Sequence, residues 1–179
     1  MLEIVIPENE YYDESKNEFV YVDSVKLSLE HSLVSISKWE SKWCKPFLDG
    51  KDKTNEEILD YIKCMIVDDI DESIFDRLTE NNLASINAYI ESPMTATKFS
   101  DNGGKTGGRE IITSEIIYYW MVAYNIPFEC QHWHLNRLLA LVRVCNIKNS
   151  PPKKMSKQEV ANRNRELNKA RRKQLNSSG

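Results

Sequence analysis

The sequence lacks the patterns by which membrane proteins and many enzymes are recognised. No run reaches the roughly 18 to 20 uncharged apolar residues that a membrane-spanning helix needs. The four cysteines form no CxxC pair, and no Gly-x-Ser-x-Gly elbow or other activated nucleophile is present. The N-terminus, MLEIVIPENE, has no basic segment and turns acidic at once, so we expect no signal peptide. These absences favour a soluble cytoplasmic protein with reduced cysteines, and they argue against an enzyme.

Three segments contain residue types found in metal or nucleotide sites, but none has the required spacing. Cys130 and His134 would share a helical face from which His132 points away, so we expect no metal there and exposed histidines instead. The acidic residues at 68–72 lack the central glycine of a calcium loop. The glycine-rich segment 101–109 lacks the first glycine of a P-loop, so we expect a partner-ordered loop. No cofactor is predicted.

The most apolar stretch, residues 113–148, is the predicted centre of the fold. Its first half places Ile117, Trp120 and Met121 on a helical stripe, and its second half does so with Leu138 and Val142. A proline at 127 separates the two halves because proline excludes the preceding residue from helical geometry. Two mostly apolar helices joined by a short turn predict an antiparallel pair.

The rest of the chain predicts a mainly α (α+β) fold. Strand patterns occur at residues 2–6, 19–22 and 25–29, with a tight turn expected at 23–24. A cap at Ser32 and a capping box at Thr54 predict two further helices, and the apolar residues Leu83, Ile86 and Ile90 predict a third at about 79–91. We therefore expect a helical bundle around the antiparallel pair at about 113–148, with a small N-terminal antiparallel β-sheet. Residues 1–150 form the predicted globular domain with an N-terminal β-hairpin, and residues 151–179 a projecting basic helix or disordered tail.

Charge divides the chain at the same place. Residues 153–179 contain nine Lys or Arg and two Glu, or +7, so residues 1–152 carry −10 of the total of −3. The basic tail is suited to nucleic-acid phosphates, to an acidic protein surface such as another copy's body, or simply to keeping the tail soluble. Its candidate binding residues are Arg163, Arg165, Lys169, Arg171 and Arg172.

Aromatic residues supply the other candidates for partner binding. Trp39 and Trp43 lie four residues apart, so their rings can be neighbours on a helix. They are either core residues or an exposed docking surface. Tyr118, Tyr119 and Trp133 in the apolar stretch are open to the same two interpretations.

Several stretches together resemble the tail assembly chaperones of long-tailed bacteriophages. They are HSLVSISKWESKWCKPFL from residue 31, LDYIKCM from 59, MTATKF from 94, and IIYYWMVAYNIPFECQHWHLNRLLALVRVCNIKN from 116, followed by PPKKMS. The resemblance covers most of the chain from about residue 25 onward. It rests on the run of the sequence, because these proteins share no short diagnostic motif.

The resemblance implies a non-catalytic protein of the host cell cytoplasm that is absent from the mature virion. Such a protein binds the long helical tape measure protein and keeps it soluble until the major tail protein polymerises around it. No catalytic residues follow from the resemblance. Self-association is a further expectation for the tail, while a membrane partner is not expected and nucleic acid is a weaker prediction. Two alternatives stay open: a nucleic-acid-binding phage protein that uses its basic tail, and a structural tail or connector component of the virion.

Overall fold

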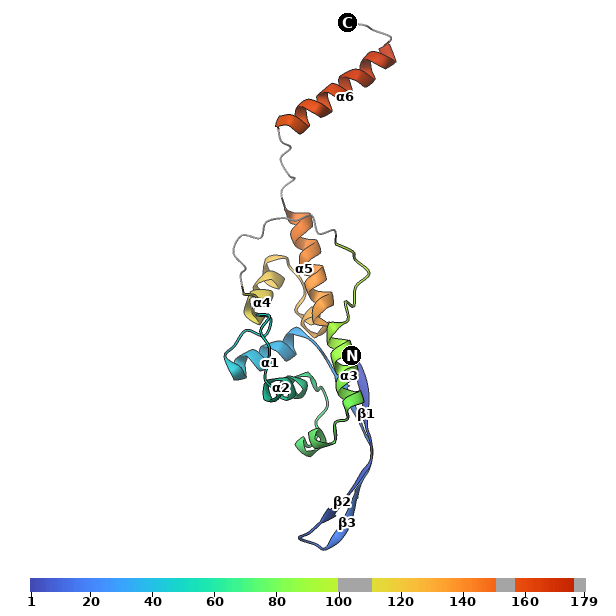
Figure 1. Ribbon diagram of the computed structural model, residues 1–179. Coiled ribbons are helices and arrows are strands. Elements are labelled where there is room, and N and C mark those ends of the chain that lie inside the picture. Colours follow the sequence, from blue (N-terminus) through green and yellow to red (C-terminus); the bar gives the residue numbers. More distant parts are fainter. Residues whose placement is uncertain (100–110, 151–156, 176–179) are drawn as a thin grey trace. The chain divides into compact units, whose positions relative to one another are not determined.

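The computed structural model describes residues 1–99, 111–150 and 157–175 (Figure 1). The chain divides into two units, Met1–Cys145 and Asn146–Gly179. In the described residues the fold contains six α-helices and two antiparallel sheets of two strands each, which confirms the predicted mainly helical α+β class. The glycine-rich segment 101–109 and the linker 151–156 lie outside the described residues, so the loop predicted at 101–109 is not tested.

The N-terminal strands form a single long β-ribbon that is interrupted once. β1 (Leu2–Ile6) pairs with β4 (Val25–Leu29), and β2 (Asn9–Asp13) pairs with β3 (Glu18–Val22). The interruption skips two residues on each side, Pro7-Glu8 and Asp23-Ser24, because proline has no N–H to donate to the ladder. Residues 14–17 make the turn at the tip.

This pairing corrects the predicted sheet. The segment at 23–24 is not a hairpin turn between strands 19–22 and 25–29, since β3 and β4 follow one another on the same side of the ribbon. The strand Asn9–Asp13 was absent from the prediction altogether. In the inner half, Ile4, Ile6, Leu27 and Leu29 are buried on one face, as the alternating pattern predicted.

The helices form a core beside the inner half of the ribbon. They are α1 (Leu33–Trp43), α2 (Asn55–Met65), α3 (Glu80–Glu91), α4 (Ser114–Ala123) and α5 (Leu135–Asn149), with the 3-10 helices η1 (Glu72–Arg77) and η2 (Phe128–His132). α1 is the central helix, because it packs on α2, α4 and η2, while α3 packs on β1. The predicted caps at Ser32 and Thr54 are formed, and Thr79 caps α3 in the same way.

The apolar stretch 113–148 is helical and buried as predicted, but its two helices are not the organising pair. Ile117 and Met121 of α4 and Leu135 and Leu138 of α5 belong to one core. The connection contains η2 rather than a short turn, and both α4 and η2 pack on α1. Among the helices, α1 supplies the main contact of α4.

A buried carboxylate explains how α1 holds the start of α4. Glu40 accepts hydrogen bonds from the backbone N–H of Phe47 at 2.8 Å and from that of Ser114 at 2.7 Å. The second bond satisfies a free amide in the first turn of α4, where a negative charge also complements the helix dipole. The N-cap Thr113 makes no side-chain capping bond, so Glu40 takes over this role from a distant part of the chain.

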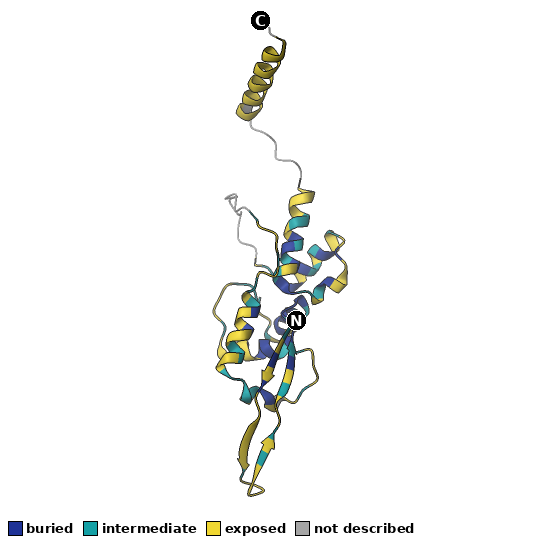
Figure 2. Cartoon of the chain, turned by 90° about the vertical axis from the view of Figure 1, so that its right-hand side faces the viewer, coloured by how far each residue is buried: buried dark blue, intermediate teal, exposed yellow. Residues whose placement is uncertain are grey.

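The second unit contains α6 (Lys157–Leu175), which has the helical structure predicted for the tail. Residues 158–175 are exposed along the whole helix (Figure 2). Its apolar residues are few, and Val160, Leu167 and Leu175 are all exposed.

Candidate protein-binding surfaces

The outer half of the ribbon presents aromatic side chains to solvent. β2 and β3 extend away from the helices, and their residues are mostly exposed (Figures 1 and 2). Glu10 pairs with Tyr21 and Tyr12 with Phe19, so these four side chains lie on one face of the ribbon. The rings of Tyr12 and Phe19 meet edge to face, with centroids 5.1 Å apart. We call Tyr12, Phe19 and Tyr21 the aromatic face.

The side chains of the aromatic face are exposed to solvent and do not belong to the hydrophobic core. Phe19 is 70% exposed and Tyr21 is 59% exposed. Single apolar residues at a surface are ordinary, but a cluster of large ones on one face is characteristic of an interaction site. These residues were not predicted from the sequence. The signal that could have found them was the run of aromatic and branched residues on both sides of a polar turn, Glu14 to Asn17.

Acidic side chains surround this face. Residues 8–23 contain six Asp or Glu and one Lys, or −5. Glu8 accepts a hydrogen bond from the Tyr21 hydroxyl at 2.7 Å, which raises the pKa of that phenol. Lys16 forms an ion pair with Asp13 at 3.5 Å. The outer ribbon is therefore an acidic surface with apolar rings in it.

A clamp from η1 and α3 fixes the ribbon where its strands are interrupted. The Arg77 guanidinium donates from Nη2 to the carbonyls of Pro7 at 2.5 Å and Asp23 at 2.8 Å. Asn82 donates from its side chain to the Val5 carbonyl at 3.1 Å. These bonds satisfy backbone oxygens that the broken ladder leaves free, so they anchor the outer ribbon on the helical body.

The tryptophan pair, for which core and docking surface were both open, lies mostly in the core. Trp39 is 1% exposed and donates from Nε1 to the Glu57 carbonyl at 2.9 Å, which corrects its prediction as a groove residue. Trp43 is half-buried and donates from Nε1 to Asp60 at 2.9 Å. The two rings stack with centroids 6.1 Å apart, as their spacing predicted. They form a rigid support rather than an open surface.

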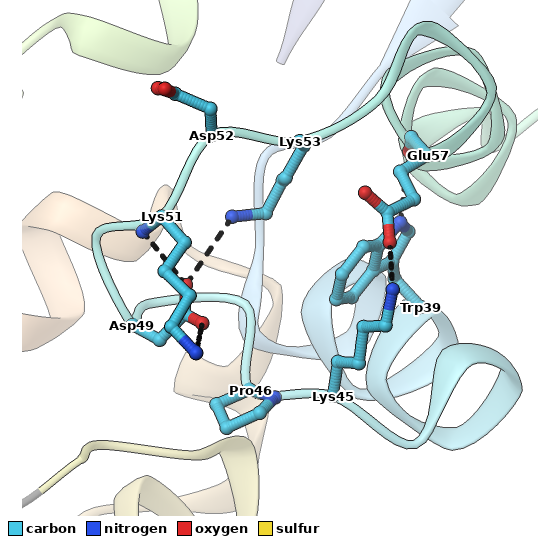
Figure 3. A pocket seen from close by; sticks show the side chains of 8 residues that line it. All are labelled: Trp39, Lys45, Pro46, Asp49, Lys51, Asp52, Lys53 and Glu57. Carbon is cyan, nitrogen blue, oxygen red and sulfur yellow. Dashed lines mark hydrogen bonds and ion pairs between the residues drawn. The ribbon is translucent and has the colours of Figure 1, made fainter.

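A small pocket of about 300 Å³ opens over the edge of Trp39 (Figure 3). Its rim is charged, but the charges are paired with one another. Lys45 meets Glu57 at 2.6 Å, and Lys53 lies 4.0 Å from Asp49. The hydrogen bond from Lys45 and the backbone N–H of Thr54 lower the pKa of Glu57. Because lysines and carboxylates already neutralise each other there, the pocket offers no strong preference for a charged ligand.

A second apolar surface lies on α4 and η2, and it includes two of the predicted residues. Tyr119 is 68% exposed, Val122 is 60% exposed and Phe128 is 54% exposed. Tyr118 is half-buried, donates its hydroxyl to Gln131 at 3.0 Å, and has its ring centroid 6.4 Å from that of Phe128. We call Tyr118, Tyr119, Val122 and Phe128 the α4 surface.

The remaining predicted residues are Trp133, which follows η2, and five basic residues on α6. Trp133 is half-buried, and the Arg137 guanidinium lies 4.0 Å from its ring centroid. On α6 the five predicted basic residues, Arg163, Arg165, Lys169, Arg171 and Arg172, are all exposed. Arg165, Lys169 and Arg172 line a shallow pocket with Asn168, which places these three cations on one side of the helix.

The histidines do not form a reactive site in the described structure. His134 is buried, contrary to the predicted exposed histidine, and donates from Nε2 to the Tyr89 carbonyl at 2.8 Å. Tyr61 shares a 2.5 Å hydrogen bond with Nδ1 of His31. Burial first, and the neighbouring His134 second, lower the pKa of His31 to about 4. These bonds join α2, α3 and the start of α5 inside the core, so their role is structural.

Metal and membrane sites were also sought in the described residues. Across residues 1–99, 111–150 and 157–175, no three His, Cys, Asp or Glu side chains are grouped so that they could hold a metal ion. No described helix combines the length and the apolar character needed to cross a membrane. Comparison of the chain with protein-family models, with curated proteins and with solved structures gives no match.

Proposed function

We propose that this protein is a bacteriophage tail assembly chaperone that binds the tape measure protein and keeps it soluble during assembly of the tail tube. The sequence resemblance from about residue 25 onward supports this assignment. On this proposal the protein is non-catalytic, acts in the host cell cytoplasm, hands the tape measure protein to the major tail protein, and is absent from the mature virion.

The α4 surface is the structural observation that carries the proposal. Tyr118 and Val122 are one helical turn apart, and the ring of Phe128 lies beside that of Tyr118. An amphipathic helix presents its apolar residues at similar intervals, so its apolar face matches such a surface. A tape measure protein, as a long helical chain, would expose many such faces before the tube encloses it.

The test is co-expression with the tape measure protein of the same phage, followed by measurement of the tape measure protein in the soluble fraction. The variant Tyr119→Ser with Phe128→Ser should reduce the soluble amount roughly fivefold or more, because it removes about 1 kcal/mol or more of contact free energy. Ile58→Ser with Val67→Ser is the matched control, since these exposed apolar residues lie elsewhere in the fold. Equal solubility with both double variants would contradict the role of the α4 surface.

A second candidate function is nucleic-acid binding through α6. The observation that favours it is the exposed basic side of this helix, with Arg165, Lys169 and Arg172 together. It predicts retention of DNA or RNA that weakens steeply as salt is raised. Against it stands the charge of −10 on residues 1–152, which repels phosphate.

A structural tail or connector component of the virion is the third possibility. Mass spectrometry of purified phage particles tests it, because a virion component would be found there and a chaperone would not.

A further inference from the structure

We propose that the acidic, aromatic outer ribbon of one copy of this protein binds the basic helix α6 of a second copy. The inference concerns self-association and does not depend on the proposed function. It starts from two surfaces that the fold leaves without a covering element: the aromatic face on β2 and β3, and the whole described length of α6.

The ribbon has the properties of a surface that a partner covers. A two-stranded ribbon alone is only marginally stable in water, and this one also exposes Tyr12, Phe19 and Tyr21 on one face. The hydrogen bonds of Arg77 and Asn82 secure only its base. Burial of the rings of the aromatic face would therefore stabilise both the ribbon and the complex.

Charge selects α6 as the occupant. Residues 8–23 carry six acidic and one basic side chain, or −5, whereas residues 157–175 carry seven basic and two acidic side chains, or +5. A guanidinium can lie over an aromatic ring and bond a neighbouring carboxylate at the same time. The outer ribbon offers this combination, because Glu8 bonds to Tyr21 and Glu10 lies opposite it.

The dimensions of the two surfaces agree. A five-residue strand such as β2 or β3 spans about 17 Å, at about 3.3 Å per residue. The basic segment 163–173 of α6 spans about 16 Å, at 1.5 Å per residue. Arg165, Lys169 and Arg172 lie on one side of that segment and can face the ribbon together.

Exchange between two copies makes the contact reciprocal. Each ribbon would receive the partner's α6, and each α6 would cover the partner's ribbon. Such an arrangement has twofold symmetry and forms two identical contacts, which closes the assembly at a dimer.

The test is the molar mass of the full chain in solution, measured by sedimentation equilibrium at low and high salt. The wild-type protein should form a dimer of about 42 kDa, twice the chain mass of 20.8 kDa. High salt should weaken the dimer because the contact is charged. The variant Arg165→Glu, Lys169→Glu, Arg172→Glu and the variant Glu8→Lys, Glu10→Lys, Glu14→Lys should each weaken dimerisation tenfold or more, with unchanged circular dichroism.

Mixing the two charge-reversed variants is the decisive step. In the mixture the acidic ribbon of one variant meets the basic α6 of the other, and the basic ribbon meets the acidic α6. A heterodimer should therefore form although each variant alone is monomeric. The matched control is Ile58→Ser with Val67→Ser, two exposed apolar residues that belong neither to the aromatic face nor to α6, and this variant should dimerise like the wild type. A monomeric wild type, a dimer insensitive to both reversals, or a mixture that stays monomeric would each overturn the proposal.

Discussion

Mild acid should destabilise the protein through His31. This imidazole is buried, lies beside His134, and accepts a hydrogen bond from the Tyr61 hydroxyl, which burial keeps protonated by raising its pKa far above the usual range. The pKa of His31 is lowered from 6.5 to about 4, by burial first and by His134 second. Between these two values the unfolded chain binds a proton that the folded protein does not accept.

The sign and size follow from that difference. Because the unfolded state binds more protons, the free energy of unfolding falls as the pH falls from about 6.5 to about 4. The full effect is about 3 kcal/mol, and the part lost between about pH 7 and pH 5 is about 2 kcal/mol. His134 acts in the same direction, since burial also lowers its pKa.

Urea unfolding at about pH 7 and pH 5 measures this loss directly. His31→Gln removes the titrating ring but keeps an acceptor for the Tyr61 hydroxyl. Between about pH 7 and pH 5 the free energy of unfolding of this variant should therefore fall by about 2 kcal/mol less than that of the wild type. His132→Gln is the matched control, because it makes the same replacement at an exposed position. If the His31 variant loses as much stability as the wild type, the ring does not titrate as the buried geometry requires.

Three further substitutions test the packing and the buried polar contacts. Trp39→Ala should lower the free energy of unfolding by about 3–5 kcal/mol, because it leaves a cavity and removes the hydrogen-bond donor to the Glu57 carbonyl. A loss below about 1 kcal/mol in urea unfolding would contradict the core position of Trp39. Glu40→Ala should cost about 2–4 kcal/mol in the same assay, since it frees the buried amide of Ser114 and a second backbone amide, and wild-type stability would refute that role. Arg77→Ala should increase the rate of backbone amide hydrogen exchange in β2 and β3 at least about tenfold, with a smaller increase in β1. An unchanged exchange rate in β2 and β3 would show that the hydrogen bonds of Arg77 do not anchor the outer ribbon.

The sequence was informative where local signals decide the structure. Ser32 and Thr54 stand directly before amphipathic segments, and each caps a helix as predicted. The strand at 25–29 was visible because half of it is buried, which leaves an alternating pattern. These elements depend on a few neighbouring residues, so the sequence alone could place them.

The strand β2 of the outer ribbon escaped prediction because it has no buried face. Asn9–Asp13 is exposed on both sides, so its sequence shows no alternation of polar and apolar residues. The pairing of β2 with β3 depends on the tip turn and on the distant Arg77, neither of which a local pattern reveals. The candidate site therefore shifted from the tryptophan pair, of which Trp39 is core, to surfaces that only the fold displays.

The central claim, that this protein works by binding other chains, is tested most directly by affinity purification from infected cells with the protein as bait. Mass spectrometry of the eluate should identify the tape measure protein, and its recovery should fall when Tyr119 and Phe128 are changed to serine. Recovery of nucleic acid with no tape measure protein, or detection of the bait in purified phage particles, would contradict the account.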